Sequence, residues 1–174
     1  GWWAEPGPTK ANDKYGEQID ELRAFMLRAR AYAEKPSEET NLKMEACVGL
    51  FNENKRMYLH VNDAKSITEA VLFAVEIGAK NPVVVGGAQS WMVTDLLKHH
   101  KIPVVLERVH SMPDNEDDDI HQPYKTAKLL FDAGILFCFN YEGDMEAMGA
   151  RNLAFSAGTA VAYGLPYEEA VKAL

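Results

Sequence analysis

The stretch RMYLHVND, from Arg56 to Asp63, starts with alternating apolar residues and ends in polar side chains where a helix is expected to begin. The alternation is typical of a buried β-strand. The imidazole of His60 and the short polar side chains of Asn62 and Asp63 come at its carboxyl end. Barrel proteins present metal-binding and catalytic groups in the loop between a strand and the next helix. The stretch therefore predicts an α/β fold with His60 as a candidate functional residue.

The same strand-then-helix plan is expected three more times along the chain. The later strands are rich in Val, Ile and Leu without clean alternation, as in parallel sheets buried on both faces. They are expected at residues 82–85, 103–107 and 135–140, and the helices at 64–77, 90–99, 121–133, 145–163 and from 166 onward. One helix between successive strands makes each connection a right-handed crossover. The fold class is therefore α/β, with about four parallel βα units that form either a partial (β/α)8 TIM-barrel-like fold or an open doubly wound sheet.

The region before these units is expected to be an arm followed by helices. Residues 1–14 are rich in Pro, Gly and polar side chains, which favours an arm. Residues 15–34 show helical apolar spacing that Pro36 ends, and a second helix is expected at about 38–51. We therefore divide the chain into an arm at 1–14 and a barrel-like domain at 15–174. Within the domain, 15–52 is a helical insertion and 55–174 holds the βα units.

Composition limits the classes of function. The chain has 174 residues, 47% of them hydrophobic, and a net charge of -8. This length supports one sizeable core, and the acidic balance argues against nucleic-acid binding. No apolar run is long enough to span a membrane and no signal peptide is visible, so we expect a soluble protein of the cytoplasm or periplasm. Cys47 and Cys138 lie in apolar contexts and are expected to be buried, reduced thiols. The abrupt start at Gly1 suggests a piece of a longer protein.

Several segments together resemble one known family. They are Leu59-His60, PVVVGG at 82–87, Ala133-Gly134-Ile135 and, most specifically, NLAFSAGTAVAYGL at 152–165. On these motifs, the chain from Asn41 to Leu174 resembles the carboxyl half of the catalytic barrel of the amidohydrolase superfamily, in its imidazolonepropionase- and prolidase-like branch. The resemblance implies one or two divalent metal ions, usually zinc, at the carboxyl face of the barrel. It also implies attack of a metal-activated water on an amide or cyclic C–N bond.

Carried over residue by residue, the resemblance implies an incomplete site. His60 matches the metal ligand of the fifth barrel strand, and Asp144 is the nearest candidate for the catalytic aspartate of the eighth. The sixth strand should end in His, but Gly86-Gly87 stand there and offer only backbone atoms. The His-x-His pair of the first strand is absent. Catalytic zinc needs about three protein ligands and a water, so this segment alone is not expected to bind zinc.

Other polar or glycine residues at the expected strand ends are candidates for substrate binding. The prediction covers Glu107, Arg108, His110, Glu142, Gly86 and Gly87. The charged residues could equally lie in a solvated loop, and the glycines could form a tight turn. For His60 the alternative is a loop histidine hydrogen-bonded to Asp63.

Three functional hypotheses follow. The leading one is a segment of an amidohydrolase-like, metal-dependent hydrolase that acts on a small-molecule amide or peptide-like substrate. The second is a non-catalytic homologue that serves as a binding or partner subunit. The third is a free-standing open α/β binding domain, which needs the Gly86-Gly87 loop at a topological switch point. Because half a barrel has exposed strand edges, self-association into a homo-oligomer is also expected.

Overall fold

A single parallel sheet organises the chain from residue 49 onward. The computed structural model describes residues 12–35, 39–106, 109–113, 117–141 and 149–174. Its four strands are β1 (Met57–Val61), β2 (Pro82–Gly86), β3 (Val104–Leu106) and β4 (Phe137–Phe139), all parallel and in the order β1-β2-β3-β4. This architecture confirms the expected partial TIM-barrel-like α/β fold. The strand order follows the chain without reversal, so the described sheet has no topological switch point. That finding contradicts the open doubly wound alternative.

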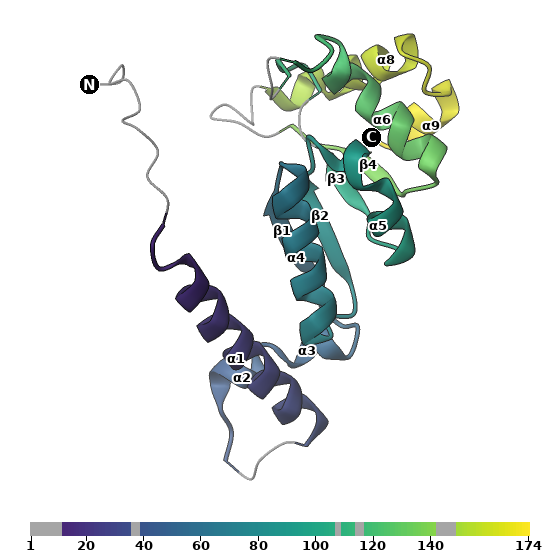
Figure 1. Cartoon of the computed structure of the whole chain (residues 1–174). Coiled ribbons are helices and arrows are strands. Elements are labelled where there is room, and N and C mark those ends of the chain that lie inside the picture. Colours follow the sequence, from purple (N-terminus) through teal and green to yellow (C-terminus); the bar gives the residue numbers. More distant parts are fainter. Residues whose placement is uncertain (1–11, 36–38, 107–108, 114–116, 142–148) are drawn as a thin grey trace, which may run out of the picture. The chain divides into compact units, whose positions relative to one another are not determined.

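Helices lie between the strands and after the last of them (Figure 1). In chain order they are α4 (Ala64–Ile77), the 3-10 helix η1 (Ser90–Val93) with α5 (Thr94–His99), α6 (Gln122–Ala133), the 3-10 helix η2 (Ala150–Asn152) with α8 (Leu153–Ala162), and α9 (Tyr167–Lys172). Within the described ranges, none of the helices is long and apolar enough to cross a membrane.

The helix ends follow the signals in the sequence. The carboxylate of Asp63 accepts a hydrogen bond from the Ser66 N–H at 2.9 Å and so caps α4. At the other end Gly78 has a φ of 82°, and Gly134 closes α6 with a φ of 74°. A side chain would be strained at such angles, so glycine ends both helices cleanly.

The chain divides into two compact units, residues 1–48 and 49–174. The first contains α1 (Tyr15–Glu34), as expected, and α2 (Leu42–Glu45). The single helix expected at 38–51 was wrong, because α2 and α3 (Val48–Phe51) are separate short helices. Between them the Cys47 N–H bonds to the Met44 carbonyl, three residues back, which tightens the turn and interrupts the α-helix.

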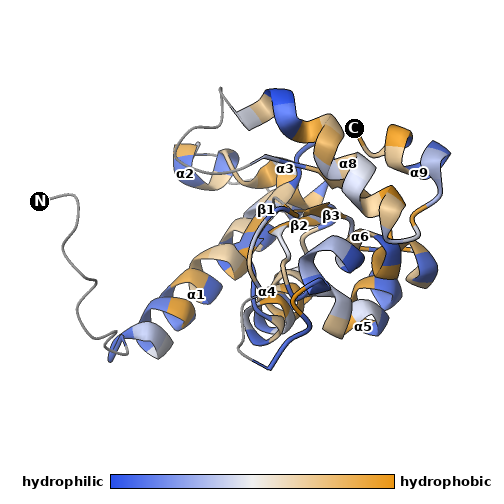
Figure 2. Cartoon of the chain, turned by 90° about the horizontal axis from the view of Figure 1, so that it is seen from above, coloured by the Kyte–Doolittle hydropathy of each residue, from blue (hydrophilic) through white to orange (hydrophobic). Residues whose placement is uncertain are grey.

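The core lies on one face of the sheet, which we call the outer face. Residues alternate between the two faces of a strand, and the outer face carries Val84, Val104, Leu106 and Phe139. These side chains pack in one cluster with buried residues of the helices, among them Ile67, Val71, Leu130 and Ala160. In the ribbon coloured by hydropathy, apolar residues (orange) alternate with hydrophilic ones (blue) along the helices (Figure 2).

The opposite face of the sheet, which we call the inner face, carries Tyr58, His60, Val83, Val85, Val105 and Cys138. Tyr58 is 55% exposed, and His60 and Cys138 are exposed as well. The expectation of a buried thiol at position 138 was therefore wrong. The reason is that the strand pattern places Cys138 on the face opposite to the helices of its own unit. Cys47 is half-buried, and both cysteines are free.

Candidate functional site

The carboxyl ends of all four strands meet at one edge of the sheet, and His60 lies near that edge. It is the penultimate residue of β1, in register with Val85, and its side chain is exposed on the inner face. The loop-histidine alternative placed its ring on Asp63. That carboxylate is instead engaged with Ser66, whose hydroxyl and backbone N–H lower the pKa of Asp63 by hydrogen bonding. A metal-binding role for His60 stays a prediction.

The Gly86-Gly87 pair forms a tight turn that joins the ends of β1 and β2. The two residues have φ angles of 100° and 64°, and the Gly87 N–H donates to the Val61 carbonyl at 2.8 Å. A Cβ on Gly86 would lie 3.0 Å from the Val61 carbonyl oxygen and 3.1 Å from Asn62 Cγ, and closer still to Asn62 Oδ1. No ordinary side chain fits at position 86, so only backbone atoms are available for contacts there. Contact of these glycines with substrate stays a prediction.

Gln89 adds a second link between the same two loops, which the sequence did not single out. Its N–H donates to the Asn62 carbonyl at 2.9 Å, and its side-chain Oε1 accepts from the Ala64 N–H at 3.0 Å. The side-chain amide oxygen of Gln89, in the loop after β2, thus accepts a hydrogen bond from the first turn of α4. No local pattern in the sequence shows this contact, because the two partners are 25 residues apart.

His110, in the loop after β3, belongs to a cluster of aromatic and polar side chains. We call it the His–Tyr cluster and define it as His110, His121, Tyr124, Thr159 and Tyr163. His110 Nε2 lies 2.7 Å from Thr159 Oγ1, and Tyr163 Oη lies 2.9 Å from His121 Nδ1. The Tyr124 ring lies between 5.3 and 6.2 Å from the other three rings. The cluster joins the β3 loop to α6 and α8, and substrate binding by His110 remains untested.

The other predicted site residues lie outside the described ranges. They are Glu107, Arg108, Glu142 and Asp144. The strands that lead to them do end together, since the Asn140 N–H donates to the Leu106 carbonyl at 2.9 Å.

A cavity of about 80 Å³ lies beside the carboxyl ends of β2 and β3. Its wall includes Leu106 from the outer face and Thr126 from α6, so it sits on the helical side of the sheet rather than near His60. The Gln122 Nε2 atom is buried there without a hydrogen-bond partner among the described residues. The remaining lining comes from the loops after β2 and β3 and the start of α6, and includes Gln89, Trp91, Met112, Asp118 and Pro123. The cavity is lined by both apolar and polar side chains.

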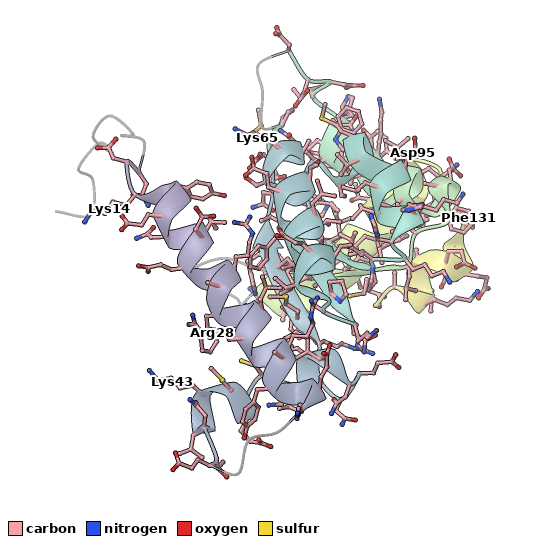
Figure 3. The ribbon with its side chains drawn as sticks, turned by 60° about the horizontal axis from the view of Figure 1, so that its bottom comes forward. Lys14, Arg28, Lys43, Lys65, Asp95 and Phe131 are labelled. Atoms are coloured by element: carbon pink, nitrogen blue, oxygen red, sulfur yellow. The ribbon has the colours of Figure 1, made fainter. Side chains whose placement is uncertain are left out.

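The described residues at this edge do not by themselves make up a zinc site. Among the described residues, no three His, Cys, Asp or Glu side chains lie close enough to hold a metal. His60 contributes one nitrogen, Gly86 contributes none, and Asp63 is committed to capping α4. Lys65 and Asp95, labelled in Figure 3, lie in the first turns of α4 and α5, and both are exposed. Because a catalytic zinc takes about three protein ligands, the described residues of one chain are too few.

Comparison with known proteins supports the fold. No protein-family profile and no curated protein sequence matches the chain. A crystal structure of an amidohydrolase from Thermotoga maritima MSB8 is similar, with a TM-score of 0.71 and 23% sequence identity. The match covers 95% of this chain and 48% of that chain. The chain therefore shares its fold with about half of that protein, and the match extends beyond the four βα units.

Proposed function

We propose that this chain is the carboxyl-terminal half of a metal-dependent, amidohydrolase-type barrel of the imidazolonepropionase- and prolidase-like branch. The complete protein would hydrolyse an amide or cyclic C–N bond in a small-molecule or peptide-like substrate. The observation that carries the proposal is His60 at the carboxyl edge of a four-stranded parallel sheet whose fold matches half of an amidohydrolase. The motifs between Asn41 and Leu174 support the assignment of this chain to the carboxyl half of that barrel.

In this proposal each residue acts from the same edge of the sheet. His60 would hold a divalent metal, most simply zinc, through a ring nitrogen. A bound zinc supplies a Lewis acid that polarises a carbonyl group and lowers the pKa of water. Asp144 would hold the transferred proton, while Glu107, Arg108, His110 and Glu142 would contact the substrate. Gly86 and Gly87 would let the substrate approach the backbone closely, because no side chain stands in front of it.

The proposal predicts that this chain alone lacks the complete metal site. We expect substoichiometric zinc after dialysis against a zinc buffer, measured by plasma mass spectrometry, and no turnover of amide or dipeptide substrates. A His60→Gln variant serves as the control, because it removes the one expected ligand and should change neither result. One zinc per chain, together with turnover that His60→Gln abolishes, would show a complete site and contradict the half-barrel proposal.

The gene provides a second, independent test. If the chain is the carboxyl half of a barrel enzyme, the reading frame should encode an aliphatic strand that ends in His-x-His ahead of Gly1. A reading frame that starts at this segment would contradict the proposal.

A non-catalytic homologue is the second candidate, and the geometry at Gly86 favours it. The position that should carry the second histidine has a φ of 100° and lies against Asn62. Substituting His at this position would therefore create strain rather than a ligand. If the protein with its preceding half binds no zinc and hydrolyses no amide, it serves as a binding or partner subunit. Zinc-dependent hydrolysis by that protein would eliminate this candidate.

A further inference from the structure

A second cavity, of about 160 Å³, lies at the amino-terminal ends of β3 and β4. This edge of the sheet is opposite to the one near which His60 lies. The described residues that line the cavity all lie between positions 97 and 136, at the ends of α5 and α6 and in the segments that lead into β3 and β4. These walls involve neither the helices before residue 49 nor any part of a barrel that would precede Gly1.

Most of the wall is apolar, and one apolar side chain in it is uncovered. Leu97, Ile102 and Ile135 are buried, whereas Leu136 is 76% exposed. The volume is roughly that of an engineered cavity of 150 Å³, lined by Leu, Ile and Phe, that binds benzene. The cavity can therefore take a compact apolar body about as large as one aromatic ring.

Two lysines form the polar part of the wall. Lys98 lies in the last turn of α5 and Lys101 follows that helix, and both are exposed. Within the described part of the chain, neither ammonium group pairs with a carboxylate, because Asp132 in the last turn of α6 is paired with Lys128. A Cβ on Gly134 would lie 4.0 Å from Lys98 Nζ, so this ammonium stands at the end of α6. A cation near the carboxyl end of a helix is favourable, which accounts for Lys98 but not for Lys101.

Lys101 holds a backbone conformation that usually belongs to glycine. Both helices end alike: the Ile102 N–H donates to the Leu97 carbonyl at 2.9 Å, and the Ile135 N–H makes the equivalent bond at the end of α6. The residue before this donor is Gly134 in α6, with a φ of 74°, but Lys101 in α5, with a φ of 55°. A lysine is strained at such an angle and a glycine is not. The chain thus keeps a cationic side chain beside the cavity at a position where glycine would be more stable.

We propose that this cavity binds a small monocarboxylate with a compact apolar body, such as an aromatic carboxylate. The ring lies against the apolar wall and covers Leu136, and the carboxylate interacts with the ammonium groups of Lys98 and Lys101. The apolar wall disfavours small hydrated anions, because their charge would lose water without gaining enough partners. The two cations in turn favour a carboxylate over a neutral molecule of the same shape. The site is separate from the proposed metal site and does not depend on hydrolase activity.

Titration with benzoate, followed by amide chemical shifts in NMR spectra, tests the site. We expect saturable binding with a dissociation constant of about 1 mM, which is ordinary for so small a ligand. The largest shifts should come from the amides of Lys101, Gly134 and Leu136. Benzyl alcohol has the ring without the charge, and acetate has the charge without the ring. Each should bind at least roughly fivefold more weakly than benzoate.

Lys101→Gly is the decisive variant, because it removes one ammonium group and also relieves the left-handed strain. It should unfold at a higher urea concentration than wild type, while its affinity for benzoate falls at least roughly threefold. Lys98→Met keeps an unbranched side chain at the end of α6 and should weaken binding by a similar factor. Lys65→Met is the matched control, since Lys65 lies in the first turn of α4 with its side chain 85% exposed. It removes the same charge and should leave the affinity unchanged.

Four results would overturn the proposal. The first is the absence of saturable benzoate binding. Equal affinity for benzyl alcohol would show that the lysines contribute nothing, and equal affinity for acetate would show the same for the apolar wall. Binding that both Lys98→Met and Lys101→Gly leave unchanged would lie elsewhere on the protein. None of these measurements involves zinc or turnover, so their failure is distinct from failure of the proposed function.

Discussion

Gly86 shows how one missing side chain shapes the edge where the candidate site lies. The residue combines a φ of 100° with a backbone that lies against Val61 and Asn62. The sequence alone presented the two glycines as a tight turn or as an open approach for a ligand. The structure shows the turn, and its positive φ and close contacts leave no room for a Cβ at position 86.

We expect Gly86→Ala to destabilise the fold by about 1–3 kcal/mol, because it adds a left-handed backbone strain and a clash with Asn62. The measurement is the urea midpoint of unfolding. Gly158→Ala is the control, since Gly158 lies in α8 with no atom within 4 Å of an added Cβ. This control should be stabilised by about 0.5–1 kcal/mol. Equal midpoints for the two variants would contradict the geometry at Gly86.

The cap at Asp63 leads to a prediction about how the stability of the fold depends on pH. Hydrogen bonds from Ser66 lower the pKa of this carboxyl below its usual value. A lowered pKa means that the carboxylate adds stability fully above the unfolded-state pKa of about 3.9, and loses it as the pH falls through the folded-state value. We expect Asp63→Ala to cost about 1 kcal/mol at pH 7, and the difference from wild type to shrink by pH 2.

The variant Asp63→Asn tests the capping hydrogen bond separately from the negative charge of the carboxylate. The amide oxygen can accept the same Ser66 hydrogen bond but does not titrate, so the acid-induced loss assigned to this position should disappear. Urea unfolding at pH 7 and pH 2 measures both variants. The same acid dependence in wild type and Asp63→Asn would show that the Ser66 contacts do not set the ionisation of this group.

At the scale of elements, the sequence predicted those with strong local signals and missed the boundaries set by tertiary contacts. The helix at 64–77 was predicted correctly because Asp63 and Gly78 mark its ends. The expected strands at 103–107 and 135–140 were too long, since only three residues of each pair in the sheet. Pairing depends on the neighbouring strand, which a local apolar run does not reveal. The His–Tyr cluster also escaped prediction, because its members come from three separate segments.

The His–Tyr cluster should stabilise the packing of α8 against α6. Tyr163→Phe removes the hydroxyl that lies 2.9 Å from His121 Nδ1. We expect a loss of about 0.5–1 kcal/mol in the free energy of unfolding, at the low end for a hydrogen bond because the pair is exposed. Tyr167→Phe is the control, because this tyrosine is 68% exposed on α9. A Tyr163→Phe variant as stable as this control would mean that the cluster contributes nothing measurable.

At the scale of the whole molecule, apolar patterning predicted a parallel sheet and the register confirms it. The sequence could not show which face of the sheet the helices cover. An apolar run is compatible with a strand buried on both faces and with a strand buried on one face. For this reason Cys138 looked like a core residue, although it lies on the inner face. A metal-binding role for His60 stays a prediction.

Cys138 therefore reports on assembly. Desolvation by its neighbours raises the pKa of this thiol, so its alkylation should be slow at pH 7 and accelerate as the pH rises toward and above 9. If the expected self-association covers the inner face, the rate per molecule, followed by mass spectrometry with iodoacetamide, should fall at least threefold as protein concentration rises. Cys138→Ser identifies the signal that belongs to Cys47. A rate independent of concentration would argue against coverage of the inner face.

The hydrogen bond from the Phe139 N–H to the Ala173 carbonyl occupies a backbone donor on the free edge of β4. An unpaired N–H on an edge strand can accept a strand of another molecule, which is a common route to aggregation. Ala173, the residue after α9, therefore protects the β4 edge of the sheet at this position. Loss of this contact is expected to raise the tendency of the protein to aggregate through β4.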